Sequence, residues 1–161
     1  MEKFQELREL AKKKLQLADH ILTMTYPVVK DSRLLLGVVE NLFLSLSYAM
    51  SSILHYELVF KRIPAFPDDF AAKLELFRDK CMNKYKIDKE HVMLIQDMKE
   101  IIVSHKKSPV EFRRKDRLII CDDSYRTRVI SVNELKGSIA KAKSFIGNAI
   151  TIVSRNDSLF N

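Results

Sequence analysis

The chain has 161 residues, of which 47% are apolar and 30% are charged, so it can form a substantial core and is not a disordered segment. Only 3 glycines and 4 prolines interrupt it, which favours long helices and argues against a turn-rich barrel or sandwich. Cys81 and Cys121 are isolated, so neither a disulfide framework nor a zinc site is indicated. The charged amino terminus lacks the apolar core of a signal peptide, which favours a cytoplasmic protein.

The net charge of +7 is unevenly distributed. Residues 1–80 contain 12 Lys and Arg against 11 Asp and Glu, whereas residues 81–161 contain 16 against 10. An excess of this kind favours a polyanionic partner such as RNA, DNA or an acidic protein. The alternative is a basic surface that serves only solubility.

The first predicted helix runs from about Lys3 to Thr25, because its apolar residues recur at helical spacing. Tyr26 and Pro27 predict its end, since the residue before a proline is disfavoured in the helical conformation.

A central helix is predicted over residues 32–61, the longest apolar segment and one without proline. Between Glu40 and His55 it has no charged residue, and its apolar side chains fall on every side of a helical wheel, so it should be buried all round. Asp31 or Ser32 is the expected cap. Serines interrupt the run of about 18 to 20 apolar residues that a bilayer span needs, so we expect no membrane.

Two shorter helices should follow. Asp68 is the expected cap of one, whose apolar face consists of Phe70, Leu74, Phe77 and Cys81. Asp88 is the expected cap of the next, from Lys89 to about Ser104, and Pro109 should close that element.

The pattern changes near Arg117, where the sequence predicts a β-hairpin over about residues 117–130. Residues 118–121 are apolar and β-branched, Asp122, Asp123 and Ser124 are typical of a turn, and residues 125–130 alternate with period two. Ser131 and Glu134 then form a capping box. It opens a last helix with an apolar seam of Leu135, Ile139, Ala142, Ile146, Ala149 and Val153.

Together these elements predict a mainly α fold, a helical bundle of about five helices around one central buried helix, with a small β-hairpin before the last helix. We expect a single domain over residues 1–155 and a frayed tail over 156–161, because no repeat or linker indicates a second domain. Phe43, Tyr48, Phe60 and the seam of the last helix are together more than one bundle is expected to bury, which predicts a homodimer.

No motif for nucleotide, zinc or acyl-transfer chemistry is present, so we expect no cofactor and no metal. His55 is predicted to be a core histidine, whereas His20 and His91 should lie at the surface. His105 stands apart, because it ends the fourth helix beside a basic region. That region comprises Lys106, Lys107, Arg113, Arg114, Lys115, Arg117, Arg126 and Arg128.

A histidine beside cations has the groups that metal-free RNA cleavage needs, a base for the 2′-hydroxyl and positive charge for the transition state. The alternative is a histidine that interacts with the negative end of the helix dipole.

The predicted architecture and the spacing of Lys99 and His105, K-x5-H at the end of a late helix, resemble the HEPN superfamily. Its members are small helical proteins, many of them dimeric RNases or RNA-associated modules of defence and toxin–antitoxin systems, with an R-x(4–6)-H signature. Lys99 stands in place of the arginine, His105 in place of the histidine, and Glu100 follows the cation. The resemblance implies that Lys99 and His105 are a catalytic pair and that the basic residues bind RNA.

Two hypotheses follow. In the first, the chain binds RNA and has weak metal-independent endoribonuclease activity, of toxin–antitoxin or defence type. In the second, it is a non-catalytic helical interaction or dimerisation module that docks on nucleic acid or on an acidic protein partner. The surroundings of His105 should separate the two.

Overall fold

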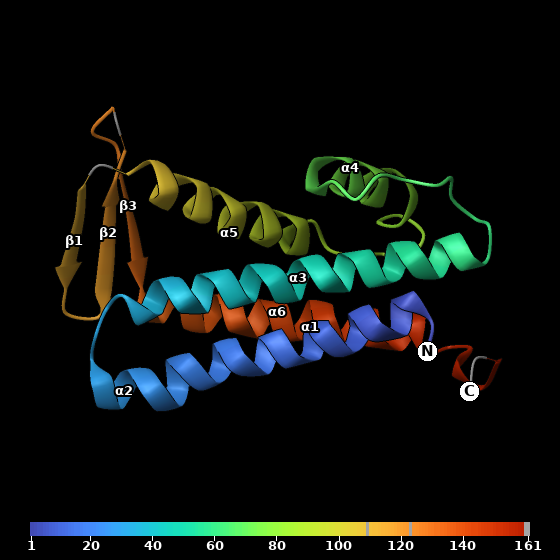
Figure 1. Ribbon diagram of the computed structural model, residues 1–161, viewed down its shortest axis with the longest axis horizontal. Helices are drawn as coiled ribbons and strands as arrows, with labels where there is room; N and C mark the ends of the chain where they lie inside the picture. The colour runs from blue at the N-terminus through green and yellow to red at the C-terminus, as the bar shows by residue number, and fades with distance from the viewer. Residues whose placement is uncertain (109, 123, 160–161) are drawn as a thin grey trace.

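The structure is a computed structural model that describes residues 1–108, 110–122 and 124–159. It confirms a mainly α protein with a small antiparallel sheet before the last helix (Figure 1). The elements in chain order are α1 (Lys3–His20), the π-helical η1 (Ile21–Thr25), α2 (Tyr26–Val29), α3 (Leu34–Val59), α4 (Phe70–Lys80), α5 (Lys89–Lys107), β1 (Val110–Arg114), β2 (Arg117–Cys121), β3 (Thr127–Ser131), α6 (Val132–Val153) and the 3-10 turn η2 (Asp157–Leu159).

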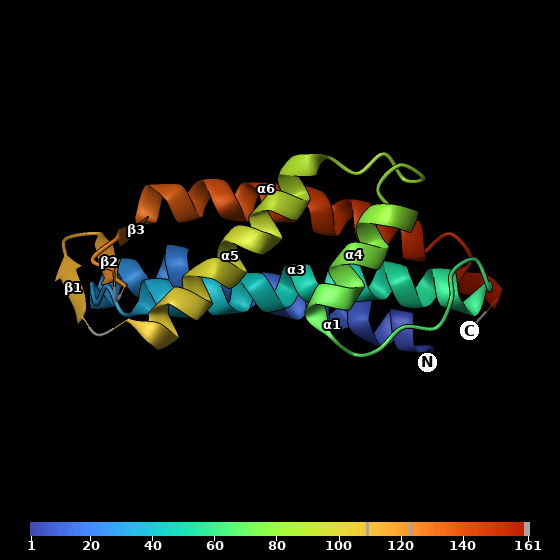
Figure 2. The same ribbon diagram turned by 90° about the horizontal axis from the view of Figure 1, so that it is seen from above.

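Helix α3 is the centre of the bundle, as predicted. Helices α1 and α6 run along it, α5 crosses it at an angle, and α4 covers the end of α3 that lies away from the sheet (Figures 1 and 2). Most apolar side chains of α3 are buried. Leu36, Leu44 and Tyr48 are only partly buried, so the prediction that the helix is buried all round is wrong.

Two serines of α3 explain how α1 packs against it. The Ser45 hydroxyl donates a hydrogen bond to the carbonyl of Ala11 (2.6 Å), and the Ser52 hydroxyl donates to that of Phe4 (2.7 Å). Both serines are buried, and their small side chains let the α1 backbone come near.

Within the described residues α3 is the one helix long and apolar enough to span a membrane, and half of its most apolar stretch is buried by the rest of the chain.

The predicted end of the first helix at Tyr26 and Pro27 is wrong. The chain passes through Pro27 as helix α2 and leaves the helical conformation at Lys30, where φ is 58°. The π-helical segment η1 explains this, because its wider turn pairs the Tyr26 N–H with the Ile21 carbonyl five residues back. A proline ring would clash with a regular α-helix, and the widened turn accommodates it.

Helices α4, α5 and α6 start at side-chain caps. Helix α3 starts after Arg33 without one, so the expected cap at Asp31 or Ser32 is wrong. Asp69, one residue later than the predicted Asp68, caps α4, and Asp88 caps α5 as predicted; each carboxylate accepts a backbone N–H of the first turn at 2.9 Å. The Ser131 hydroxyl caps α6 in the same way at 3.1 Å. The predicted closing residue of α5, Pro109, lies outside the described residues.

The sheet has three antiparallel strands in the order β1-β2-β3. The predicted hairpin corresponds to β2 and β3, and its turn residue Asp123 lies outside the described residues. The sequence does not predict strand β1, because its two arginines and the preceding proline mask its alternation. It pairs with β2 through a two-residue turn, Lys115 and Asp116, in which Asp116 has a φ of 58°.

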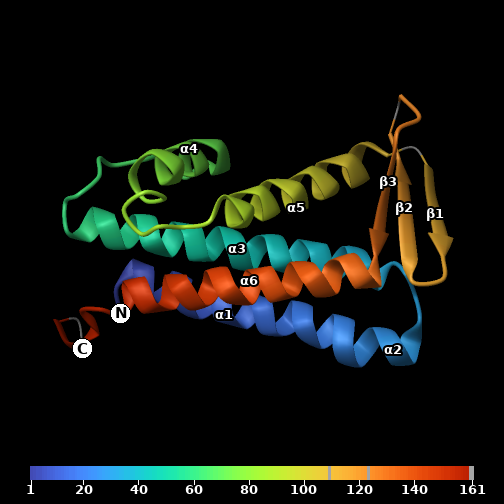
Figure 3. The same cartoon turned by 180° about the vertical axis from the view of Figure 1, so that it is seen from behind.

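The sheet lies across one end of the bundle (Figures 1 and 3). Its inner face is fixed by Leu118, Ile120 and Ile130, which are buried against the helices. The Tyr26 hydroxyl donates to the Asp116 carboxylate (2.7 Å) and ties the β1–β2 turn to α2. Burial and the Asp116 carboxylate raise the pKa of Tyr26, so this donor stays protonated.

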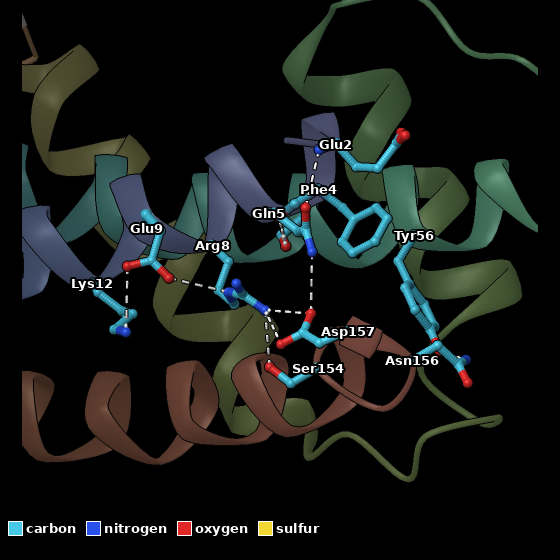
Figure 4. A network of polar contacts seen from close by, with 11 residues as sticks. Glu2, Phe4, Gln5, Arg8, Glu9, Lys12, Tyr56, Ser154, Asn156 and Asp157 are labelled. Atoms are coloured by element: carbon cyan, nitrogen blue, oxygen red, sulfur yellow. Dashed lines mark hydrogen bonds and ion pairs between the residues drawn. The ribbon is translucent and has the colours of Figure 1, made fainter. Parts of the chain in front are cut away.

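The carboxyl-terminal segment is fastened to α1, as Figure 4 shows. Arg8 donates to the Asp157 carboxylate and to the Ser154 hydroxyl, each at 3.0 Å, and Gln5 donates to Asp157 at 3.2 Å. The tail predicted as frayed thus begins with residues that contact the bundle; residues 160–161 lie outside the described residues.

The apolar residues that suggested a homodimer pack within a single copy of the chain. Leu135, Ile139 and Ile146 are buried, and Phe43, Tyr48 and Phe60 are partly buried against the core. These side chains do not require a second copy, and the homodimer stays a prediction.

Candidate nucleic-acid interface

His105 lies in the last turn of α5, where its imidazole meets strand β1. Its Nδ1 contacts the Glu111 carboxylate, and the two groups form an ion pair only when the imidazole is protonated. The side chains of both residues are about one-third exposed, at 32% and 33%. The His105 imidazole therefore already has a partner, the Glu111 carboxylate of the same chain.

Lys99 faces a different part of the molecule. Its ammonium lies 5.2 Å from the ring centre of Phe43 and 5.6 Å from that of Phe70, so it makes cation–π contacts with α3 and α4. The structure does not bring the predicted catalytic pair together, because Lys99 contacts these two rings whereas His105 contacts β1.

Arg128 also has a structural role. Its Nη2 donates to the carboxylates of Asp97 on α5 (2.9 Å) and Glu134 on α6 (2.7 Å). This bridge joins β3 to both helices. The guanidinium is thus already paired, and it is a poor candidate for holding phosphate.

Three acidic residues of the basic region that the structure describes, Glu111, Asp116 and Asp122, are engaged by neighbours. Asp122 accepts from the backbone of Arg126 and Ser124 and from the Arg126 guanidinium (3.0 Å), and the backbone bond to Arg126 is the main reason why the pKa of Asp122 is lowered. The Asp116 carboxylate accepts a hydrogen bond from the Tyr26 hydroxyl, and the Glu111 carboxylate contacts His105. These carboxylates are therefore not available to neutralise other cations.

The remaining cations of the region are exposed and form no ion pair with another described residue. They are Lys106 and Lys107 at the end of α5, and Arg113, Arg114, Lys115 and Arg117 around the β1–β2 turn. Arg114 and Arg117 are cross-strand partners, so their side chains project from the same face of the sheet next to the turn. We call Arg113, Arg114, Lys115 and Arg117 the sheet-end patch.

Two further cations, Lys30 and Arg33, come from the α2–α3 connection, and the sequence did not point to either. Arg33 donates to the Asp31 carboxylate at 2.6 Å; these hydrogen bonds, with a smaller effect of the Arg113 charge, lower the pKa of Asp31 to about 2. The effect of Arg113 shows that the connection lies close to the sheet-end patch. Only the fold reveals this proximity, because about 80 residues separate them.

The other histidines do not join this surface. His55 is half-buried beside Phe66 and lines a cavity of about 410 Å³ between α1, α3 and α4, and burial lowers its pKa. His91, predicted at the surface, is instead buried with its ring 5.4 Å from that of Phe145, and burial lowers its pKa as well. Within the described residues no group of three or more potential metal ligands occurs.

Comparison with known proteins adds no relative: no protein-family model matches the chain, and no curated protein matches its sequence. A function must therefore be inferred from the residues and their geometry.

Proposed function

We propose that the protein binds RNA through the sheet-end patch and does not cleave it. The observation that carries the proposal is the set of exposed cations, Arg113, Arg114, Lys115 and Arg117, on a hairpin whose acidic neighbours are already engaged. Unpaired guanidinium groups in a fixed arrangement favour phosphate, because each can donate two parallel hydrogen bonds to its oxygens.

The form of the surface favours RNA over duplex DNA. The patch belongs to a short sheet across the end of the bundle (Figure 3). Specific readers of duplex DNA usually insert a helix or a protruding β-ribbon into the major groove. Open sheet faces are instead a common platform for single-stranded RNA.

The surroundings of the predicted catalytic pair argue for binding without cleavage. Lys99 is held between two aromatic rings, and His105 is in contact with Glu111. A general base and a transition-state cation must both reach one scissile phosphate. The kinship with the HEPN superfamily stays a prediction, and RNA binding at the sheet-end patch does not depend on it.

The test is the binding of a fluorescein-labelled RNA, followed by anisotropy over a range of salt concentrations. Affinity should fall steeply with salt, because bound cations displace condensed counterions. Replacing Arg114 and Arg117 together with Ala should weaken binding about tenfold or more and reduce the salt slope by about 1 for each lost phosphate contact.

The matched control removes the same charge elsewhere. Arg78 and Lys80 are exposed on α4, at the other end of the bundle from the sheet (Figure 1). Replacing both with Ala should leave affinity nearly unchanged. Equal losses in the two double variants would mean that net charge, not the patch, holds RNA.

Two outcomes would overturn the proposal. If the wild-type protein retains no RNA even at low salt, an acidic protein becomes the better explanation of the charge. If RNA is cleaved during the incubation and His105→Ala abolishes the cleavage, the protein is a nuclease, and the non-catalytic part of the proposal is wrong.

A further inference from the structure

The outer face of the sheet carries an apolar row. The register aligns Phe112 on β1 with Ile119 on β2 and Val129 on β3. Successive residues of a strand point to opposite faces, so this row lies opposite the buried Leu118 and Ile130. It therefore points away from the bundle.

These apolar side chains remain accessible. Phe112 is 47% exposed and Val129 is 40% exposed, while Ile119 between them is partly buried. Figures 1 and 3 show the sheet at one end of the bundle. About half of the surface of Phe112 is thus open to solvent.

Cations flank the apolar row on the same face. Arg114 follows Phe112 by two residues, and Arg117 precedes Ile119 by two, so both point outward beside the row. Two residues along a strand span roughly 7 Å, within the reach of an arginine side chain. An aromatic ring bordered by unpaired guanidinium groups fits a ligand that combines planar apolar groups with negative charge.

We propose that this outer face binds single-stranded RNA, with a base stacked on Phe112 and the neighbouring phosphates held by Arg114 and Arg117. The inference rests on the proposed function and goes further, because it names the strandedness of the RNA and the residue that contacts a base. In a duplex the bases stack on one another, and their faces are not accessible to a side chain.

Charge complementarity disfavours the two other ligands that could cover an apolar sheet face, a second copy of the chain and a neutral apolar partner. A second copy placed on the row with its strands parallel to the first would bring its own Arg114 and Arg117 close to those of the first, and in the reversed orientation it would supply no counter-charge to them. A neutral apolar partner would leave both guanidinium groups without counter-charges. Single-stranded RNA supplies the anion and the planar ring together.

The first experiment uses the fact that the protein contains no tryptophan. Phe112→Trp introduces a single tryptophan at the proposed stacking position, and its emission can be excited apart from that of the five tyrosines. Titration with a short oligouridine should quench its emission, because a stacked base lies directly against the indole. Met93→Trp is the control, since Met93 is 63% exposed on α5 and lies in a groove between α5 and α6; its emission should not change.

The second experiment measures affinity for the same oligouridine by anisotropy. Phe112→Ala should weaken binding about tenfold, the lower part of the range for one stacked base, and should leave the salt slope unchanged. Phe112→Tyr should bind like the wild type, because it keeps the ring. An RNA duplex of equal length should bind at least tenfold more weakly than the single strand.

The outcomes separate the two proposals. If RNA binds with a steep salt dependence but the emission of the Phe112→Trp variant is not quenched, or duplex and single strand bind equally, the stacking inference is wrong and the proposed function stands. If no RNA binds at any salt concentration, both are wrong. Should Phe112→Ala fail to fold, Phe112→Trp and Phe112→Tyr still decide the question.

Discussion

Glu57 shows how one buried charge organises a part of the fold distant from the sheet. Its side chain is 1% exposed, accepts from Lys84 at 2.7 Å and Arg62 at 3.3 Å, and is in contact with the Tyr85 hydroxyl. Burial alone would raise the pKa of Glu57, but the hydrogen bonds from Lys84 and Tyr85 and the nearby cations lower it. The carboxylate thus joins α3 to the segments on either side of α4.

Replacing Glu57 with Gln should therefore lower the free energy of unfolding by about 2 kcal/mol, because a charged acceptor of several hydrogen bonds is lost in a buried place. Urea denaturation would measure the loss. Glu40→Gln is the control, since Glu40 is an exposed residue of the same helix. A shift of the same size in both variants would contradict the assigned role.

Arg128 should behave differently from the arginines of the sheet-end patch. Because it bridges Asp97 and Glu134, Arg128→Ala should lower the free energy of unfolding by about 1 kcal/mol. Arg114→Ala, by contrast, should change stability by less than about 0.5 kcal/mol and should weaken RNA binding. The two variants would be compared by urea denaturation and RNA anisotropy. Unchanged stability of Arg128→Ala would show that the bridge is weak.

At this scale the sequence could predict which residues are charged and exposed, but not which cations are already paired. In the sequence Arg128 resembles any exposed strand residue, but the register places it on the same face as the buried Ile120 and Ile130. Its partner Asp97 is 31 positions away on α5, so the pairing depends on how α5 and the sheet meet. The surface prediction for His91 is wrong for a similar reason, because α6 covers it with Phe145.

Among the elements, the contact between α1 and α3 depends on small hydroxyl side chains. Ser45→Ala should cost about 1 kcal/mol, because it removes the hydrogen bond to Ala11. Ser45→Leu should cost about 3 kcal/mol, because the larger side chain would push α1 away. Ser144→Leu, on the exposed side of α6, controls for the added bulk. Denaturation midpoints would rank the three, and an equally stable Ser45→Leu protein would contradict the close packing.

The long helices of this fold could be predicted from their apolar patterns, and α5 and α6 also from the local start signals Asp88 and Ser131. The exceptions have tertiary causes. Helix α2 continues through Pro27 because η1 widens the preceding turn, and apolar periodicity does not indicate a π-helical turn. Strand β1 forms by pairing with β2, which its own sequence does not indicate. That Phe112 lies in a row with Ile119 follows only from the register of the two strands.

For the whole molecule, stability should decrease as the pH falls from 7 toward 5. Burial lowers the pKa values of His55 and His91 in the folded state below the ordinary value of 6.5. The unfolded chain then binds protons more readily than the folded one, so the free energy of unfolding falls as the pH drops through and below about 6.5.

Urea midpoints at pH 7.5 and 5.5 would measure this change. A variant with His55 and His91 both replaced by Gln should show a smaller difference between the two pH values, because glutamine does not titrate. Carboxylates with lowered pKa values, such as Glu57 and Asp157, should add a further loss only in more acidic solution. A midpoint that rises at pH 5.5 would contradict the prediction.

The central position of α3 between an early helix and a late one has a consequence for synthesis on the ribosome. Helices α1 and α3 emerge first, but the face of α3 that α6 covers stays open until residue 153 has been made. At translation rates of about 5 to 20 residues per second, the interval from the end of α3 lasts roughly 5 to 20 seconds. The nascent chain should therefore expose apolar surface to chaperones, and ribosome-bound chains stalled after α5 should be cleaved by protease faster than the released chain of 161 residues.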